Sequence, residues 1–176
     1  METAIVTVAR AYHFAAQKHV DQRRKGEAAE PYMNHLTEVA ELVATATGGE
    51  DIDVLVAAIL HDTIEDTGVT VDELSGAFGP KVTALVLEVT DDKRLPKPTR
   101  KELQVEHAAN ASWGARVIKL ADKTSNLRSL AASPPADWPR ARRDEYVAWA
   151  TRVVSQCRDA NAWLAGQFDA AAKALA

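Results

Sequence analysis

The sequence contains little cysteine and has no long apolar run. Cys157 is the one cysteine among 176 residues, so the chain cannot form an internal disulfide, which is typical of proteins from a reducing cytoplasm. The longest apolar run, VLVAAIL, is far too short to span a bilayer. The first residues, METAIVTVAR, lack the basic and apolar regions of a signal peptide. We therefore expect a cytoplasmic protein with no membrane partner.

An excess of basic charge is also absent. The chain has 21 basic and 25 acidic residues, a formal charge of −4, so no general attraction to nucleic acid is expected. A local basic cluster could still bind phosphate groups. Nearly half of the residues, 47%, are apolar, and the length suits one domain, residues 1–176, with a sizeable core.

Apolar residues recur at helical spacing, and no run of residues has the period of a β-strand. Glycines at 48 and 49 are expected to end one helix, and Thr70 with Glu73 has the form of a capping box. The sequence predicts an all-α fold of roughly eight helices. The expected helices cover residues 3–19, 34–47, 51–65, 70 onward, 80–89, 99–110, 115–130, and 137 onward with Asp137 as the cap.

Four charged or titratable residues follow the most apolar segment, in the stretch HDTIEDT. His61 and Glu65 are four residues apart, as are Asp62 and Asp66, so each pair shares a face of an expected helix end. The negative end of the helix dipole disfavours acids there, and the acids repel one another. A bound divalent cation would make this arrangement favourable. A solvated helix end is the alternative that an HD dipeptide alone does not exclude.

Two further residues strengthen the case for a metal. His35 lies near the start of an amphipathic helix, and Asp122 lies beside an inward-facing apolar stripe, so its carboxylate must be paired or bind an ion. Imidazole and carboxylate ligands suit Mn, Fe, Co or Zn better than Mg or Ca. The set of His35, His61, Asp62 and Asp122 has no thiolate, which argues against a structural zinc site.

Four segments together resemble the hydrolase of the RelA/SpoT family of HD-domain phosphohydrolases. They are FAAQKHVDQRRKGEAAEPYMNH, AAILHDTIEDT, VLEVTDDKRLPKPTRKELQVEHA and VIKLADKTSNLRSL, and they run from about residue 4 to residue 150. The chain is most similar to the small alarmone hydrolases that include the metazoan SpoT homologues. This resemblance implies an HD-type helical fold. It also implies hydrolysis of ppGpp or pppGpp, which releases the 3′-pyrophosphate and leaves GDP or GTP.

The resemblance also assigns roles to individual residues. It implies that one Mn²⁺ is bound by His35, His61, Asp62 and Asp122, and that Glu65 and Asp66 act on the attacking water. A carboxylate near the ligands can orient a water or take its proton. The substrate-binding residues that it implies, with Lys97 and Trp138 at the pocket rim, are Arg23, Arg24, Lys25, Tyr32, Lys97, Asn126, Trp138, Arg142 and Tyr146.

Spacing supports several of these assignments. Asn126 lies one turn after Asp122, so both can face one cavity, and Arg142 and Tyr146 are four residues apart on the last helix. A guanidinium in the basic loop at residues 23–25 can stack on a base and bind phosphate oxygens, although the same charge run also suits a solvated loop.

The chain departs from the larger relatives at Ser125, where they usually have an aromatic or histidine residue. Pocket details and substrate preference depend on this position. The chain is too short to hold a synthetase half, so we expect it to degrade its substrate. An NADPH 2′-phosphatase, a catalytically silent alarmone-binding module and a purely structural helical protein are the alternatives. The sequence determines neither the oligomeric state nor the preference between ppGpp and pppGpp.

Overall fold

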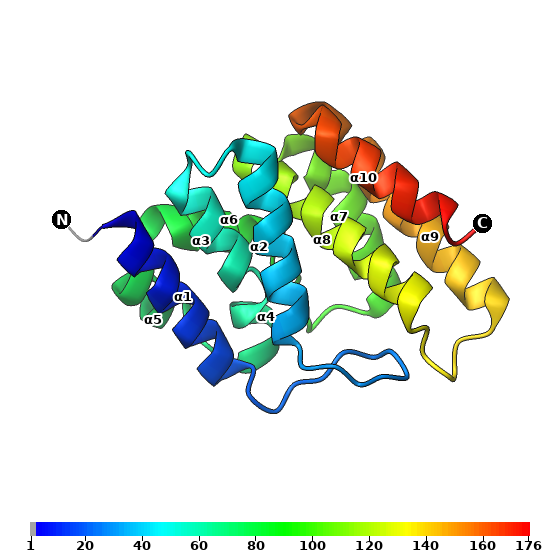
Figure 1. Cartoon of the computed structure of the whole chain (residues 1–176), viewed down its shortest axis with the longest axis horizontal. Coiled ribbons are helices and arrows are strands. Elements are labelled where there is room, and N and C mark those ends of the chain that lie inside the picture. The colour runs from blue at the N-terminus through cyan, green and yellow to red at the C-terminus, as the bar shows by residue number, and fades with distance from the viewer. Residues whose placement is uncertain (1–2) are drawn as a thin grey trace.

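The computed structural model describes residues 3–176, and this part of the chain is built from helices (Figure 1). The all-α class is confirmed. No helix in the described part is long and apolar enough to cross a membrane. That residues 1–176 form a single domain stays a prediction. The helices are α1 Ala4–Lys18, α2 Met33–Thr47, α3 Ile52–Leu60, α4 Thr63–Thr67, α5 Val71–Phe78, α6 Pro80–Val89, α7 Lys97–Asn110, α8 Trp113–Ala132, α9 Arg140–Ser155, the 3₁₀ helix η1 Arg158–Ala160, and α10 Ala162–Lys173.

Two of the expected helices are each divided in two. The expected helix over residues 51–65 breaks at His61 and Asp62 into α3 and α4. At the break, the His61 ring bonds the carbonyl oxygen of Ala58 at 2.8 Å, the oxygen that a continuous helix would give to the amide of residue 62. No glycine or proline marks this break, so helical spacing alone could not find it.

The long last helix is also divided. Asn161 accepts a hydrogen bond from the amide of Leu164 at 2.9 Å and begins α10, while its amide group donates to the carbonyl oxygen of Ala46 at 2.9 Å. The start of α10 is therefore fixed to the end of α2. Asp137 does not cap α9, because the helix begins at Arg140 and Pro139 occupies the cap position.

Most of the other expected helix ends agree with the structure. Gly48 has the left-handed conformation, with φ 66°, that ends α2. The Thr70 hydroxyl accepts a hydrogen bond from the amide of Glu73 at 3.1 Å, whereas the Glu73 carboxylate pairs with Lys18 at 2.7 Å instead of completing a capping box.

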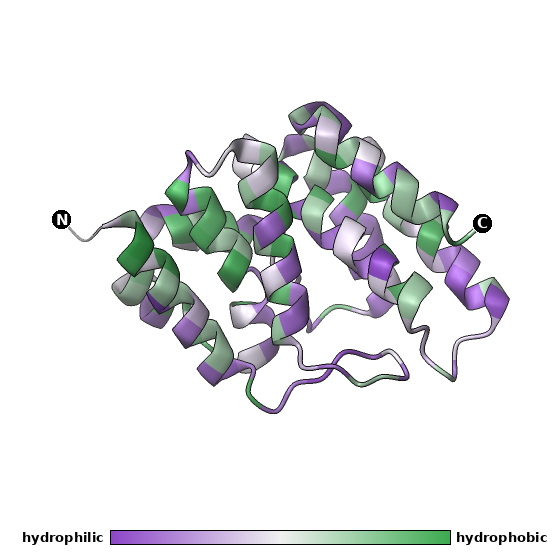
Figure 2. Cartoon of the chain, in the orientation of Figure 1, coloured by the Kyte–Doolittle hydropathy of each residue, from purple (hydrophilic) through white to green (hydrophobic). Residues whose placement is uncertain are grey.

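The helices α3 and α8 form the centre of the hydrophobic core. In Figure 2, α3 is among the most uniformly apolar helices, and its residues from Val56 to Leu60 are buried. Helix α8 packs against α2, α3, α6, α9 and α10. Gly114 allows this close packing, because a Cβ there would lie 2.8 Å from a Val54 methyl carbon and 2.9 Å from a Leu85 methyl carbon.

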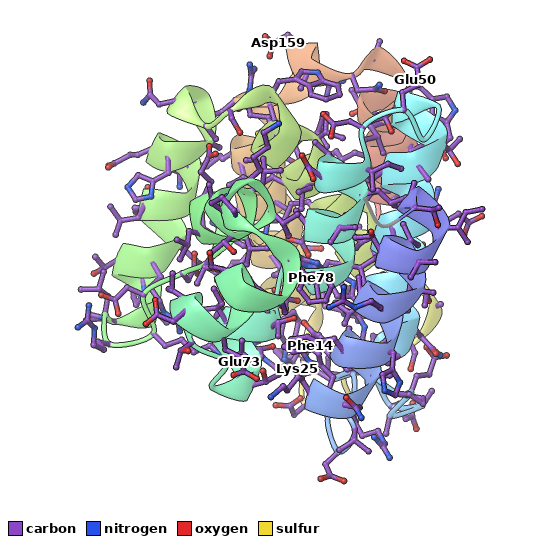
Figure 3. The ribbon with its side chains drawn as sticks, turned by 90° about the vertical axis from the view of Figure 1, so that its left-hand side faces the viewer. Phe14, Lys25, Glu50, Glu73, Phe78 and Asp159 are labelled. Atoms are coloured by element: carbon purple, nitrogen blue, oxygen red, sulfur yellow. The ribbon has the colours of Figure 1, made fainter. Side chains whose placement is uncertain are left out.

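The N-terminal helix covers one side of this core. The ring of Phe14 in α1 meets the ring of Phe78 in α5 edge to face, with centroids 5.4 Å apart (Figure 3). The loop that follows α1 lies against the end of α8, since the Ser133 hydroxyl accepts from the amide of Ala28 at 2.9 Å. A Cβ on Gly26 would lie 2.3 Å from the Ser133 carbonyl oxygen, so the loop needs glycine there. This contact places the basic loop over the polar face of α8.

Candidate functional site

The four predicted metal ligands lie together where α2 begins, where α3 is followed by α4, and near the middle of α8. The Nε2 atom of His35 lies 3.3 Å from Asp122 Oδ1 and 3.6 Å from Asp62 Oδ2. The Nε2 atom of His61 lies 3.1 Å from Asp62 Oδ2 and 3.9 Å from Asp122 Oδ1. Ligand atoms of His35, His61 and Asp62 all lie within 4.8 Å of one another. Asp122, which follows His35 by 87 positions in the chain, lies within 3.9 Å of both histidines and so belongs to the same group.

The second ring nitrogen of each histidine is already occupied. His35 Nδ1 lies 2.9 Å from the Ser125 hydroxyl, and His61 Nδ1 lies 2.8 Å from the Ala58 carbonyl oxygen. Both Nε2 atoms are buried and form no hydrogen bond with the described residues. With the proton on Nδ1, each ring directs a lone pair toward the two carboxylates. This donor set fits a divalent cation.

The electrostatics of the group lead to the same interpretation. Burial lowers the pKa of His35. Burial also acts to lower the pKa of His61, but Asp62 and Asp122 outweigh it and raise that pKa to about 9. Burial opposes ionisation of Asp62, yet His61 holds its pKa below the usual range; Lys123 and the two histidines do the same for Asp122. The carboxylates are thus ionised, and a proton on His61 is what a cation would displace.

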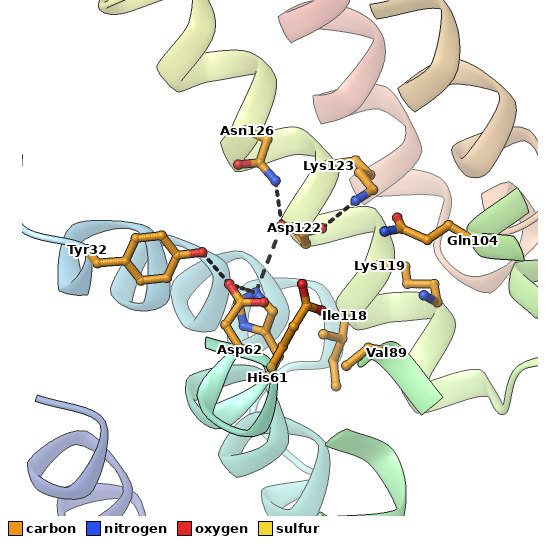
Figure 4. Close-up of a pocket in the computed structure, with 11 residues that line it drawn as sticks. Tyr32, His61, Asp62, Val89, Gln104, Ile118, Lys119, Asp122, Lys123 and Asn126 are labelled. Atoms are coloured by element: carbon orange, nitrogen blue, oxygen red, sulfur yellow. Dashed lines mark hydrogen bonds and ion pairs between the residues drawn. The ribbon is translucent and has the colours of Figure 1, made fainter. Parts of the chain in front are cut away.

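A cavity of about 130 Å³ opens beside this group (Figure 4). Three residues predicted from the sequence, Tyr32, Glu65 and Asn126, line it together with His61, Asp62 and Asp122 of the group. The Tyr32 hydroxyl donates to Asp62 Oδ2 at 2.5 Å, and the Asn126 amide donates to Asp122 Oδ1 at 2.6 Å. The full lining comprises Tyr32, His61, Asp62, Glu65, Val89, Gln104, Ile118, Lys119, Asp122, Lys123 and Asn126.

Glu65 has the properties of a general base. Its Oε2 atom accepts a hydrogen bond from the amide of Asp91 at 2.9 Å. Burial, followed by the charges of nearby acids such as Asp62, raises its pKa to about 7 despite that hydrogen bond. A carboxyl group with this pKa can take up and release a proton near neutral pH.

Asp66 is placed differently from Glu65, because it is not among the residues that line the cavity. Its Oδ2 atom accepts a hydrogen bond from the Gln22 amide at 2.7 Å, and its Oδ1 atom pairs with the Lys93 ammonium group. The side-chain oxygen Oε1 of Gln22 in turn lies 2.5 Å from Nδ1 of the buried His19. Asp66 thus connects α4 to the loop that follows α1 and to the loop between α6 and α7, and its action on water stays a prediction.

The three predicted basic-loop residues have three different surroundings. Arg24 Nη1 donates to Asn126 Oδ1 at 3.3 Å, and its guanidinium lies 5.9 Å from the centre of the Tyr32 ring, so it borders the cavity. Arg23 bonds the carbonyl oxygens of Val20 and Gln22 in its own loop. Lys25 is exposed. Of the three, the structure brings Arg24 to the site.

Three other predicted residues belong to what we call the outer aromatic cluster. The cluster is made of the predicted Trp138, Arg142 and Tyr146 together with Lys101 and Trp149. The Trp138 and Tyr146 rings are 5.7 Å apart, and the Arg142 guanidinium lies 4.5 Å from the Trp138 ring centre. The Lys101 ammonium lies 4.7 Å from the Trp149 ring. Lys97 is exposed at the start of α7.

This cluster connects with the cavity through Lys123. The Lys123 ammonium lies 4.6 Å from the Trp149 ring on one side and 2.9 Å from Asp122 Oδ2 on the other. Burial raises the pKa of Tyr146 to about 12, so its hydroxyl remains a hydrogen-bond donor at neutral pH.

Comparisons with known proteins agree with this geometry. The sequence profile of the HD domain family matches residues 11–151. This chain belongs to the HD domain family. It is 46% identical over 169 residues to guanosine-3′,5′-bis(diphosphate) 3′-pyrophosphohydrolase MESH1 of Xenopus tropicalis, covering 96% of this chain and 94% of that protein. It is 51% identical over 148 residues to the human protein of the same name, covering 84% of this chain and 83% of that protein.

A solved structure is similar over nearly the whole chain. It is described as "A metazoan ortholog of SpoT hydrolyzes ppGpp and plays a role in starvation responses", and it matches with a TM-score of 0.90 and 44% identity. The match covers 94% of this chain and 93% of that one. The resemblance to the SpoT homologues that the sequence motifs indicate is confirmed.

Sequence reasoning missed three polar residues of this HD domain's cavity: Gln104, Lys119 and Lys123. The two lysines could have been found from spacing. Lys119 precedes Asp122 by three residues and Lys123 precedes Asn126 by three, so each lysine lies on the same side of α8 as one of these predicted site residues. Gln104 has no such signal, since α7 reaches the cavity only through the tertiary fold.

The position of Ser125 differs from the expectation. It is buried, it does not line the cavity, and its hydroxyl lies against His35. The same hydroxyl donates to Glu38 Oε2 at 2.7 Å, and Glu38 pairs with Arg128 at 3.1 Å. Ser125 must therefore accept the proton of His35 Nδ1, which leaves Nε2 for an ion. The departure at this position concerns the orientation of His35 and not the pocket wall.

The only cysteine has no role in the site. Cys157 is buried in the core, and burial raises the pKa of its thiol, so the nucleophilic thiolate is disfavoured.

Proposed function

We propose that this protein hydrolyses the alarmone ppGpp or pppGpp and releases the 3′-pyrophosphate, with one Mn²⁺ as its cofactor. The observation that carries the proposal is the pair of buried, unbonded Nε2 atoms of His35 and His61 facing two ionised carboxylates, with Glu65 on the same cavity. The similarity to proteins named as 3′-pyrophosphohydrolases supports the choice of substrate.

The proposed ion is held by His35, His61, Asp62 and Asp122. When bound, such an ion polarises a phosphoryl oxygen and lowers the pKa of a water. The nitrogen and oxygen donors and the absence of thiolate suit Mn²⁺, Fe²⁺, Co²⁺ or Zn²⁺, and the family resemblance favours Mn²⁺.

The protein's own groups supply the proton transfers in the proposed reaction. A water oxygen forms a bond to the phosphorus that carries the ribose 3′ oxygen, and the bond from that phosphorus to the 3′ oxygen breaks. Glu65 receives a proton from the water, and the 3′ oxygen takes up a proton as it leaves. Because its pKa is raised to about 7, Glu65 is suited to this exchange near neutral pH.

The size of the cavity indicates how the substrate lies. Pockets that enclose a whole drug-sized ligand measure about 300–1,000 Å³, whereas the cavity here measures about 130 Å³. It therefore encloses the phosphate end alone. The nucleoside then lies outside, between Arg24 and the outer aromatic cluster, where a guanidinium and aromatic rings can stack on a base.

The test is a parallel assay of Mn²⁺-loaded protein with ppGpp, pppGpp and NADPH, and with the Glu65→Ala variant as control. We expect pyrophosphate release from the alarmones and none from the variant. Metal-free protein reloaded with Mn²⁺, Fe²⁺, Co²⁺ or Zn²⁺ would test the choice of ion.

Other outcomes would replace the proposal. Phosphate release from NADPH without alarmone hydrolysis would identify a 2′-phosphatase. Tight binding of ppGpp without turnover, under every metal, would identify a binding module.

A further inference from the structure

Lys119 is a buried cation without an anionic partner. Its side chain is 6% exposed and lines the cavity, and it forms no hydrogen bond or ion pair with the described residues. Burial and the nearby charge of Lys123 lower its pKa, and the charges of Asp122 and Asp91 oppose this shift without forming an ion pair with it. Buried charges in proteins are normally paired, so an anion from outside is expected to complete this position.

The neighbours of Lys119 already have partners. The Lys123 ammonium is 2.9 Å from Asp122 Oδ2, and the Gln104 amide donates to Asp91 Oδ2 at 2.6 Å. Figure 4 shows Lys119 and Gln104 on the side of Asp122 away from Tyr32. The cavity therefore has two parts, the proposed metal ligands with Tyr32 and Asn126, and a second part with the two lysines.

We propose that Lys119, with Lys123 beside it, binds the terminal phosphate of a substrate diphosphate and so favours a 3′-diphosphate over a ribose monophosphate. This inference rests on the proposed function. The phosphorus that is attacked must lie near His61, Asp62 and Glu65, and a second phosphate must then extend into the rest of the cavity, whose lining includes both lysines. A monophosphate has no group to reach them.

The chemistry of the two groups agrees with this assignment. A diphosphate end carries more negative charge than a monophosphate end, and an ammonium group with three donors can bond several of its oxygens. In a buried site this attraction is stronger than in water. The same pair of charges would hold the released pyrophosphate briefly after the P–O bond breaks.

The test compares Lys119→Met with Lys81→Met, which removes the same charge from a side chain that is 85% exposed. For metal-loaded protein, we expect the affinity for inorganic pyrophosphate, measured by calorimetry, to fall about 10- to 100-fold in Lys119→Met. The affinity for inorganic phosphate should fall much less, and kcat/KM for ppGpp should fall more than that for NADPH. Lys81→Met should match the natural protein.

A stability measurement separates binding from a structural role. Removing a buried unpaired charge should leave the melting temperature of metal-free Lys119→Met equal or higher. If Lys119→Met does not fold, Lys119→Gln, which keeps a polar end, takes its place in the same measurements. Unchanged pyrophosphate affinity, or equal losses for pyrophosphate and phosphate, would overturn the proposal. Because pyrophosphate binding needs no turnover, Lys119 is tested even if the protein proves unable to hydrolyse ppGpp.

Discussion

The inner cavity and the outer aromatic cluster are both polar, but they satisfy their polar groups in opposite ways. In the cavity, the Nε2 atoms of His35 and His61 are buried and unbonded to the described residues, and the buried residue Lys119 forms no ion pair with them. In the outer cluster, Arg142 lies over Trp138 and pairs with Asp137 at 3.6 Å. The cavity thus contains buried polar groups without a partner in the described part of the chain, whereas Arg142 in the outer cluster has both an aromatic ring and a carboxylate beside it.

This difference separates groups for chemistry from groups for recognition. Buried polar groups without a partner lower the stability of the fold. Their attraction to an ion or a phosphate is strong, because little water screens it. Stacking between exposed groups contributes less binding free energy than a contact in a buried site, and it depends less on which base is bound. Substitutions in the cavity should therefore have large effects on rate or metal affinity, and substitutions in the outer cluster small effects on substrate affinity.

The largest effect is expected from Glu65→Gln, which keeps the shape of the side chain and removes its basicity. We expect kcat for ppGpp hydrolysis to fall about 100- to 10,000-fold. Steady-state pyrophosphate release checks this, with Glu106→Gln on the exposed face of α7 as the matched control. A fall of less than tenfold would move the general base elsewhere, with Asp66 as the next residue to replace.

The same variant should remove a pH effect on stability. Folding raises the pKa of Glu65 from its ordinary value of 4.5 to about 7. Between these values the folded state binds more protons than the unfolded state, so this group lowers stability as pH rises from 4.5 to about 7. Metal-free Glu65→Gln should therefore gain melting temperature over the natural protein at pH 8 and gain least below pH 4.5. An equal difference at both pH values would show that the carboxyl group is not strained by burial.

Ser125→Ala should have the next largest effect, on metal affinity. The change removes the acceptor of His35 Nδ1 and leaves Glu38 without the hydroxyl donor, so the ring loses its fixed tautomer. We expect metal affinity to fall about 10- to 100-fold, as for other groups that orient a ligand histidine. Ser129→Ala, one turn further on α8, is the control, because its hydroxyl bonds none of the described residues. Equal metal affinities in the two variants would show that Ser125 only fills space.

Local signals in the sequence predict the helical class, and they single out charged residues that the fold brings into one group; that this group binds a metal stays a prediction. His61, Asp62 and Asp122 lie beside the most apolar segments of the chain. A charged group next to such a segment is expected to be paired or to bind an ion, and this expectation needs no knowledge of the tertiary fold. The break between α3 and α4 was not predictable, because it depends on the bond from His61 to Ala58 and not on a glycine or proline.

Groups brought together by the tertiary fold were harder to predict. Gln104 lies on α7, and no rule of sequence spacing predicts that this helix reaches the cavity. Gln22 donates a hydrogen bond to Asp66, which lies 44 residues later in the chain. Glu65 and Asp66 also look equivalent in the sequence. The fold distinguishes them, since Glu65 lines the cavity while Lys93 and Gln22 bind Asp66.

The smallest effect is expected in the outer aromatic cluster. Trp138→Ala removes the ring on which Arg142 lies, and we expect KM for ppGpp to rise about 3- to 10-fold with a smaller change in kcat. Arg142→Ala should behave alike, and the double variant should lose less than the two single losses combined, because each residue positions the other. Steady-state kinetics of the three variants checks this. A kcat loss as large as that of Glu65→Gln would mean that this cluster also takes part in the chemical step, and the division between the two regions would fail.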